Sequence, residues 1–142
     1  MIKKTKPEKI MRPRSEKPKL MVVDNEIDIC NFVKSFFGMR GYEVSTALNG
    51  DEALSKLLDE SPDLVMLDVS MRTQKEGFEY LPQIKKLLPG VKVIMVTGIE
   101  DDNSIEEARK LGADDYITKP LVLEYLETSV FHKIRALSTT PG

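Results

Sequence analysis

Short apolar segments alternate along the chain with stretches in which apolar residues return every three or four positions. The first pattern is typical of strands buried between two helix layers, and the second of helices with one buried face. The predicted strands are residues 20–23, 42–46, 63–68, 91–96 and 114–118. The predicted inward-facing helix residues include Ile29, Val33, Phe36 and Phe37; Ala53, Leu54, Leu57 and Leu58; Phe78, Leu81, Ile84, Leu87 and Leu88; Ile105, Ala108 and Leu111; and Leu123, Leu126, Val130, Ile134 and Leu137.

Local signals place several helix ends. Asn49 opens the second helix, and Asn103, with Glu106 three residues later, forms a possible capping box for the fourth. Gly112 suits the position just after that helix. Pro82 fits best in the first turn of the third helix. Proline has no backbone N–H, and only beyond the first turn would that N–H be needed for a helical hydrogen bond.

Strand and helix alternate five times with short connections, which predicts an α/β, doubly wound parallel sheet with helices on both faces. The 142 residues suffice for one domain, and the hydrophobic (41%) and charged (31%) fractions are those of a soluble protein. No apolar run reaches the roughly 18 residues of a membrane span. Because Cys30 is the only cysteine, an internal disulfide is excluded, and we expect a cytoplasmic location.

Charge is spread unevenly. Residues 1–19 hold eight basic residues against two glutamates, whereas the whole chain carries a net charge of −2. We expect residues 1–18 to form a basic, disordered arm that is solvated, although such an arm can also contact an anionic partner. The ordered domain is expected over residues 19–137, with a flexible tail at 138–142.

Polar residues follow four of the predicted strands. They are Asp24 with Asn25, Asp68, Thr97 and Lys119. In open α/β sheets, ligands bind at the carboxyl ends of the strands, so we expect these groups to share one crevice. Carboxylate oxygens suit Mg²⁺, and a carboxylate can itself be the nucleophile in phosphoryl transfer.

At these motifs the chain resembles the receiver domains of two-component response regulators. The matching segments are Val22–Glu26, Leu67–Val69, Val96–Gly98 and Gly112–Pro120. The resemblance implies the flavodoxin-like (βα)5 receiver fold with strand order 2-1-3-4-5. It also implies a signalling protein that is not an enzyme acting on other substrates, because it catalyses only its own phosphorylation and dephosphorylation.

The resemblance assigns a role to each strand-end residue. Asp68 is the implied phosphoacceptor, charged by a sensor histidine kinase or a phosphotransfer protein. Asp24, Asn25, Asp68 and the backbone carbonyl of Ser70 would hold Mg²⁺. Lys119 and Thr97 would contact the phosphoryl group, Tyr116 would be the second switch residue, and Lys119–Pro120 would be a cis peptide.

Two features depart from the family pattern. Receivers usually have a second acidic residue where this chain has Asn25, so we expect weakened Mg²⁺ binding. The loop after Asp68 has Arg72 in place of proline and reaches Gly77 one residue late. We expect this loop to be longer and looser, with Arg72 and Lys75 facing solvent, although either could approach the phosphoryl group.

The sequence leaves alternatives open. The first reading is a phosphorylated receiver that switches a protein-binding face made by the fourth helix, the last strand and the last helix. It would act as a monomer or weak homodimer, with no DNA-binding domain, or be a fragment of a longer regulator. The second is a pseudo-receiver that binds protein without phosphate control, and an enzyme on the same fold is third. The lone His132 is expected in solvent, and Cys30 as an inert packing thiol.

Overall fold

The predicted strands form one parallel sheet in the computed structural model, which describes residues 17–98 and 102–138. The spatial order is β2-β1-β3-β4-β5, as expected from the resemblance. The strands are β1 (Lys19–Val23), β2 (Glu43–Ala47), β3 (Leu64–Asp68), β4 (Lys92–Thr97) and β5 (Asp115–Thr118). The predicted basic arm lies outside the described residues up to position 16, as does the tail from position 139.

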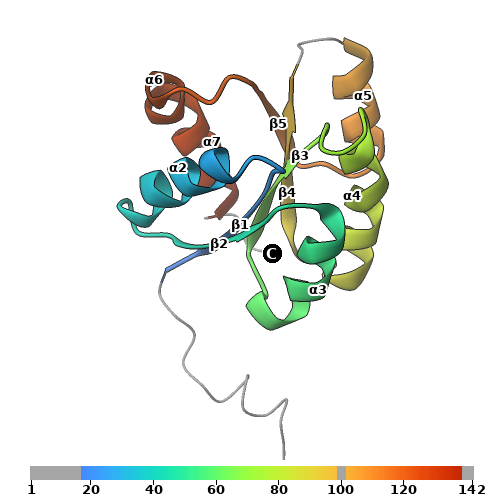
Figure 1. Cartoon of the computed structure of the whole chain (residues 1–142), viewed down its shortest axis with the longest axis horizontal. Coiled ribbons are helices and arrows are strands. Elements are labelled where there is room, and N and C mark those ends of the chain that lie inside the picture. The colour runs from blue at the N-terminus through green and yellow to red at the C-terminus, as the bar shows by residue number, and fades with distance from the viewer. Residues whose placement is uncertain (1–16, 99–101, 139–142) are drawn as a thin grey trace, which may run out of the picture.

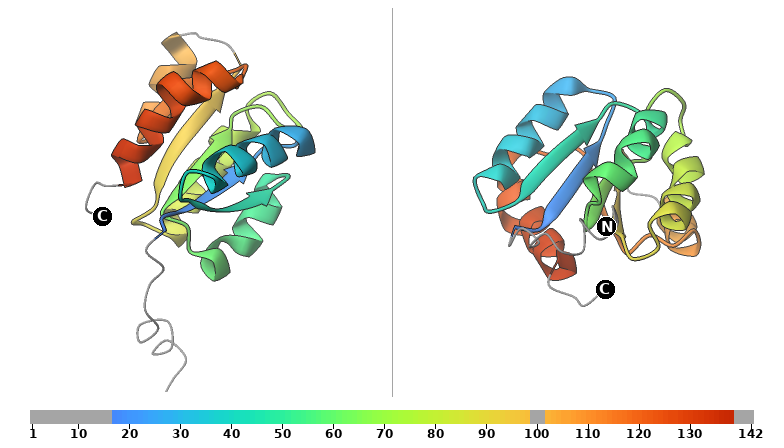
Figure 2. Two further views of the ribbon diagram at one scale, coloured as in Figure 1. Left: turned by 90° about the vertical axis from the view of Figure 1, so that its left-hand side faces the viewer. Right: turned by 90° about the horizontal axis from the view of Figure 1, so that it is seen from below.

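Helices cover both faces of the sheet (Figure 1). They are α2 (Ile27–Gly38), α3 (Gly50–Glu60), α4 (Glu76–Leu87), α5 (Asp102–Lys110), α6 (Leu123–Tyr125), the π-helical turn η1 (Leu126–Val130) and α7 (Phe131–Ser138). Helices α2, α6 and α7 lie on one face, and α3, α4 and α5 on the other, as the two rotated views also show (Figure 2). The doubly wound architecture is therefore confirmed.

Each face of the sheet has its own apolar core. Side chains alternate along a strand, so Leu20 and Val22 of β1 pack toward α2 and α7, and Met21 and Val23 pack toward α3 and α4. All four are buried. This two-sided burial explains why the central strands read as continuous apolar runs rather than as alternating ones.

Three of the predicted inward-facing leucines are instead exposed: Leu58 (53%), Leu87 (44%) and Leu123 (51%). Leu87 is the last residue of α4 and Leu123 the first of α6, so each lies at a helix end. Leu58 lies one position beyond the buried Leu57 and therefore points about 100° away from it.

Two helix starts were predicted wrongly. Helix α4 begins at Glu76, so Pro82 lies inside it rather than in its first turn. Helix α5 begins at Asp102, which places Asn103 within the helix instead of at its cap. The prediction for Gly112 is confirmed, because its φ of +105° is left-handed and its N–H donates to the carbonyl of Arg109.

Within residues 17–98 and 102–138, no helix is long and apolar enough to cross a bilayer.

Candidate functional site

Three strands deliver one charged side chain each to a single point at the carboxyl edge of the sheet. Asp24 follows β1, Asp68 ends β3, and Lys119 follows β5. The Lys119 Nζ lies 2.8 Å from Asp68 Oδ2 and 3.3 Å from Asp24 Oδ2. The structure thus brings together three of the residues predicted from sequence, with both carboxylates converging on one ammonium group.

Both carboxylates are withdrawn from water, since Asp68 is 1% exposed and Asp24 3%. Burial raises the pKa of Asp68 to about 6, against the opposing hydrogen bond from Lys119, and the nearby charge of Asp24 adds to the rise. Burial alone would lower the pKa of Lys119, but its hydrogen bond to Asp68 and the charges of both aspartates raise it above its ordinary value. The site therefore holds two acids and one permanent cation.

The end of β4 supplies Thr97, the last residue of that strand. Its side chain is buried, and its Oγ1 lies 3.5 Å from the carbonyl oxygen of Ile117, to which it donates a long hydrogen bond. The backbone carbonyl of Thr97 accepts a 2.8 Å bond from the N–H of Lys119, which ties the two strand ends together. The Lys119–Pro120 peptide is cis, as predicted.

The residues that flank the two aspartates hold them in place. Asp24 Oδ1 accepts a hydrogen bond from the N–H of Glu26 at 2.8 Å, so its side chain braces the turn into α2 instead of capping the helix. Asp68 Oδ1 accepts one from the N–H of Ser70 at 3.2 Å. Asn25 is exposed beside them.

Tyr116 does not join this group. It is half-buried on β5, with the Lys133 ammonium 4.8 Å from the centre of its ring. The same ammonium donates a 2.8 Å hydrogen bond to the Tyr116 carbonyl. Its proposed role as a switch thus depends on the resemblance alone.

The loop after Asp68 is held by hydrogen bonds rather than loose, contrary to prediction. The buried carboxylate of Glu76 accepts hydrogen bonds from the backbone N–H groups of Arg72 and Thr73 and pairs with the Arg72 guanidinium. The Lys75 ammonium lies 3.3 Å from a carboxylate oxygen of Glu107 on α5. Arg72 and Lys75 are exposed, as expected, and Glu76 is the residue that sequence reasoning missed. The signal that could have found it was an opposite charge four residues after Arg72.

The donor set suits a hard cation. Asp24 and Asp68 present carboxylate oxygens to one point, and Mg²⁺ in proteins is commonly held by one or two carboxylates with water and phosphate oxygens completing the shell. The described part of the chain contains no cluster of three acidic, histidine or cysteine ligands, because Asn25 stands where a third carboxylate would. The two carboxylates of Asp24 and Asp68 fit Mg²⁺, although they carry one negative charge fewer than three acidic residues would.

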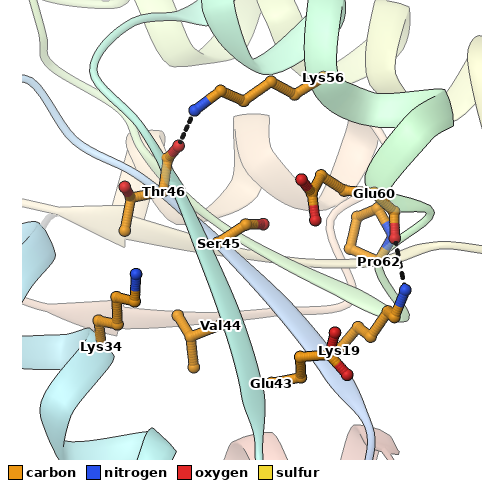
Figure 3. A pocket seen from close by; sticks show the side chains of 9 residues that line it. All are labelled: Lys19, Lys34, Glu43, Val44, Ser45, Thr46, Lys56, Glu60 and Pro62. Atoms are coloured by element: carbon orange, nitrogen blue, oxygen red, sulfur yellow. Dashed lines mark hydrogen bonds between the residues drawn. The ribbon is translucent and has the colours of Figure 1, made fainter. Parts of the chain in front are cut away.

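A hollow of about 290 Å³ lies away from this site, along the outer edge of β2 between α2 and α3 (Figure 3). Lys34 and Lys56 point toward it from the two helices. Lys56 donates a 2.7 Å hydrogen bond to the carbonyl of Thr46 in the edge strand. None of the strand-end residues of the candidate site lines it.

Comparison with known proteins decides the family. Residues 20–131 match the family described as the response regulator receiver domain. The chain is a response regulator receiver. It is 37% identical over 129 residues to the "Probable transcriptional regulator ycf27" of Cyanophora paradoxa, covering 87% of this chain and 53% of that protein. It is also 37% identical over 102 residues to the PhoP regulator of alkaline phosphatase synthesis in Bacillus subtilis, covering 72% of this chain and 42% of that protein.

Solved structures agree with this assignment. The receiver domain of NtrX from Brucella abortus has a TM-score of 0.72 and 34% identity, covering 85% of this chain and 99% of that one. A CheY-like receiver from Methanospirillum hungatei JF-1 has a TM-score of 0.74 and 31% identity, covering 87% and 98%. This receiver spans about half the length, or less, of the curated relatives it matches.

Proposed function

We propose that this receiver takes a phosphoryl group onto Asp68 from the phosphohistidine of a sensor histidine kinase or phosphotransfer protein. An Asp68 oxygen forms the new P–O bond, the P–N bond breaks, and the histidine nitrogen keeps the electron pair and takes up a proton. The observation that carries the proposal is the convergence of two buried carboxylates and one ammonium at the ends of three parallel strands. It is supported by membership of the receiver family.

Asp24, Asp68, the Ser70 backbone carbonyl and Asn25 are the groups that would hold Mg²⁺. When bound, the metal would neutralise charge on the phosphoryl oxygens. Lys119 would release Asp24, stay near the acceptor and neutralise a second oxygen, because phosphoryl transfer depends on positioning and charge stabilisation. Thr97 would turn its hydroxyl from the Ile117 carbonyl toward a phosphoryl oxygen. The lost carboxylate at position 25 would weaken the metal site.

The phosphoryl group would act on other proteins by shifting a population between two forms of the domain. We propose that the face made by α5, β5 and α6–α7 then gains or loses a protein partner, with Tyr116 as the second switch residue. The protein would work in the cytoplasm, as a monomer or weak homodimer. It would catalyse only its own phosphorylation and dephosphorylation. The ordered domain is proposed to span residues 19–137.

The test is intact-mass spectrometry after incubation with acetyl phosphate, with and without Mg²⁺. We expect one added phosphoryl group that requires Mg²⁺ and disappears in Asp68→Asn. The matched control is Asp59→Asn, which removes an exposed carboxylate of α3 and should leave the modification intact. A folded wild-type protein that gains no mass at any Mg²⁺ concentration would contradict the proposal.

One observation favours a second candidate function. Lys119 already pairs with both aspartates, so the site is satisfied without a metal, and Asn25 lowers the negative charge available to attract one. Such a site suits a pseudo-receiver that binds protein irrespective of phosphate. The absence of phosphorylation in the same experiment would favour that function.

A further inference from the structure

Glu76 is a buried carboxylate that none of the roles proposed above uses. It is the first residue of α4 and is 4% exposed. A buried charge destabilises a protein by several kcal/mol unless partners compensate it, so its partners show what it does. Its hydrogen-bond and ion-pair partners, Arg72 and Thr73, belong to the loop that follows Asp68.

The carboxylate binds the tip of that loop with both oxygens. Oε1 accepts hydrogen bonds from the backbone N–H groups of Arg72 (2.8 Å) and Thr73 (3.3 Å). Oε2 accepts from the Arg72 guanidinium, at 3.0 Å from Nε. The side-chain hydrogen bond from Arg72 is the largest cause that holds the pKa of Glu76 below its ordinary value. Glu76 is therefore ionised and engaged at neutral pH.

The next residue, Gly77, closes the base of the loop. Its N–H donates a 2.7 Å hydrogen bond to the carbonyl of Val69. A Cβ at this position would lie 2.1 Å from the backbone oxygen of Asp68, so only glycine lets α4 approach so closely. Two consecutive residues thus fix both the base and the tip of the loop, which absorbs its extra residue without loosening.

Ser70 lies between the base and the tip. Its N–H donates to Asp68 Oδ1, and its hydroxyl donates to the carbonyl of Gln74. The N–H of Met71 donates to the carbonyl of Thr73 at 3.1 Å, which folds the tip back on itself. The orientation of the Ser70 peptide therefore depends on a loop shape that the Glu76 carboxylate holds.

We propose that Glu76 is a positioning residue for the acceptor site: by clamping the loop, it sets the Ser70 carbonyl for Mg²⁺. This inference depends on the Mg²⁺ site of the proposed function, because the Ser70 carbonyl matters only if that site binds a metal. Receiver domains commonly have proline at the position of Arg72. In this chain the ion pair between Arg72 and Glu76 would shape the loop instead. Groups that orient metal ligands without touching the metal typically change metal affinity by 10- to 100-fold when removed.

The test compares Glu76→Gln and Glu76→Ala with Glu79→Gln, which makes the same charge change on an exposed residue of the same first helical turn. Mg²⁺ is titrated into each ¹⁵N-labelled protein and followed through the Ser70 and Val69 amide resonances. We expect Glu76→Ala to raise the Mg²⁺ Kd roughly tenfold and Glu76→Gln to raise it less, because an amide oxygen still accepts from the loop N–H groups. Glu79→Gln should match the wild type.

Amide hydrogen exchange in metal-free protein supplies the second readout. The Arg72 and Thr73 amides should exchange faster in the Glu76 variants, with the β-sheet amides unchanged, which excludes general unfolding. Should Glu76→Ala fail to fold, Glu76→Gln carries the comparison. Equal Mg²⁺ Kd values in wild type and folded Glu76 variants would overturn the inference even if Asp68 is phosphorylated. A raised Kd in a protein that takes no phosphoryl group would sustain the inference and contradict the proposed function.

Discussion

At the scale of single residues, the buried charge of Asp68 opposes folding. The pKa of Asp68 is raised to about 6 by burial, so the native state binds more protons than the unfolded chain between about pH 4 and pH 6. The free energy of unfolding therefore falls as pH rises through this window, and the full penalty is present at pH 7. The burial that raises the pKa of Asp68 therefore lowers the free energy of unfolding at pH 7.

Asp68→Asn should consequently stabilise the metal-free protein at pH 7. Removing the buried charge relieves repulsion with Asp24, and the amide keeps an acceptor for Lys119. We expect the free energy of unfolding in urea to rise by about 1–3 kcal/mol, with the gain disappearing near pH 4. Mg²⁺ should stabilise the wild type but not the variant. A less stable variant at pH 7 would show that the Lys119 ion pair outweighs desolvation.

Asn25→Asp makes the opposite change, because it adds a carboxylate beside the site instead of removing one. Asn25 is exposed next to buried Asp24, so a carboxylate there adds a hard oxygen ligand without a large desolvation penalty. We expect the Mg²⁺ Kd, measured by calorimetry, to fall about tenfold, or about 1.4 kcal/mol. An exposed change further along the chain, Asn31→Asp on α2, should leave it unchanged. Equal affinities for wild type and Asn25→Asp would place position 25 outside the metal site.

At the scale of elements, the contact between α4 and the end of β3 allows no side chain at position 77. Gly77→Ala puts a methyl group against the Asp68 backbone and should lower the free energy of unfolding by about 1–3 kcal/mol. Gly90→Ala, at a glycine with open space around its Cβ, is the control and should change stability by less than about 0.5 kcal/mol. Equal urea midpoints for the two variants would contradict the close approach.

The same element shows how far sequence reasoning reached. Strand β3 was predictable because Leu64–Leu67 form a short continuous apolar run of strand length, and Asp68 follows that run directly. The start of α4 was not, because Glu76 is polar and buried, and only its ion pair with Arg72 makes that burial favourable. Pro82 was misplaced for the same reason: the helix begins at Glu76, two residues before Phe78, where its apolar pattern starts. The Arg72–Glu76 pair joins a loop residue to the first residue of a helix, so it adds nothing to the apolar period by which the helix was predicted.

At the scale of the whole molecule, Cys30 reports on global unfolding. Its thiol is buried between α2 and the sheet, and burial raises its pKa to about 11. Because the thiolate is the reactive form, the folded protein should react with a thiol reagent only when it opens. We expect labelling at pH 8 to be far slower than in urea, and its rate to follow the stability of the variants above. Rapid labelling of the native protein would reveal local opening of α2.

The strand order of the whole sheet could be anticipated only through the resemblance. Alternation of strands and helices fixes a parallel sheet, but several orders satisfy right-handed crossovers. The apolar pattern of the two faces does not separate them, because every central strand is buried on both sides. The order β2-β1-β3-β4-β5 brings Asp24, Asp68 and Lys119 together. A correct prediction of the strand order therefore also predicts which side chains form the site.

The lysines on the two outermost strands have a consequence for behaviour at high concentration. Lys56 donates to the Thr46 carbonyl on β2, and Lys133 to the Tyr116 carbonyl on β5. Unsatisfied carbonyls on an outer strand are templates for cross-β growth, and a cation seated on them repels an identical incoming chain. We therefore expect each edge strand to resist pairing with an identical chain, which is the step that begins fibril growth.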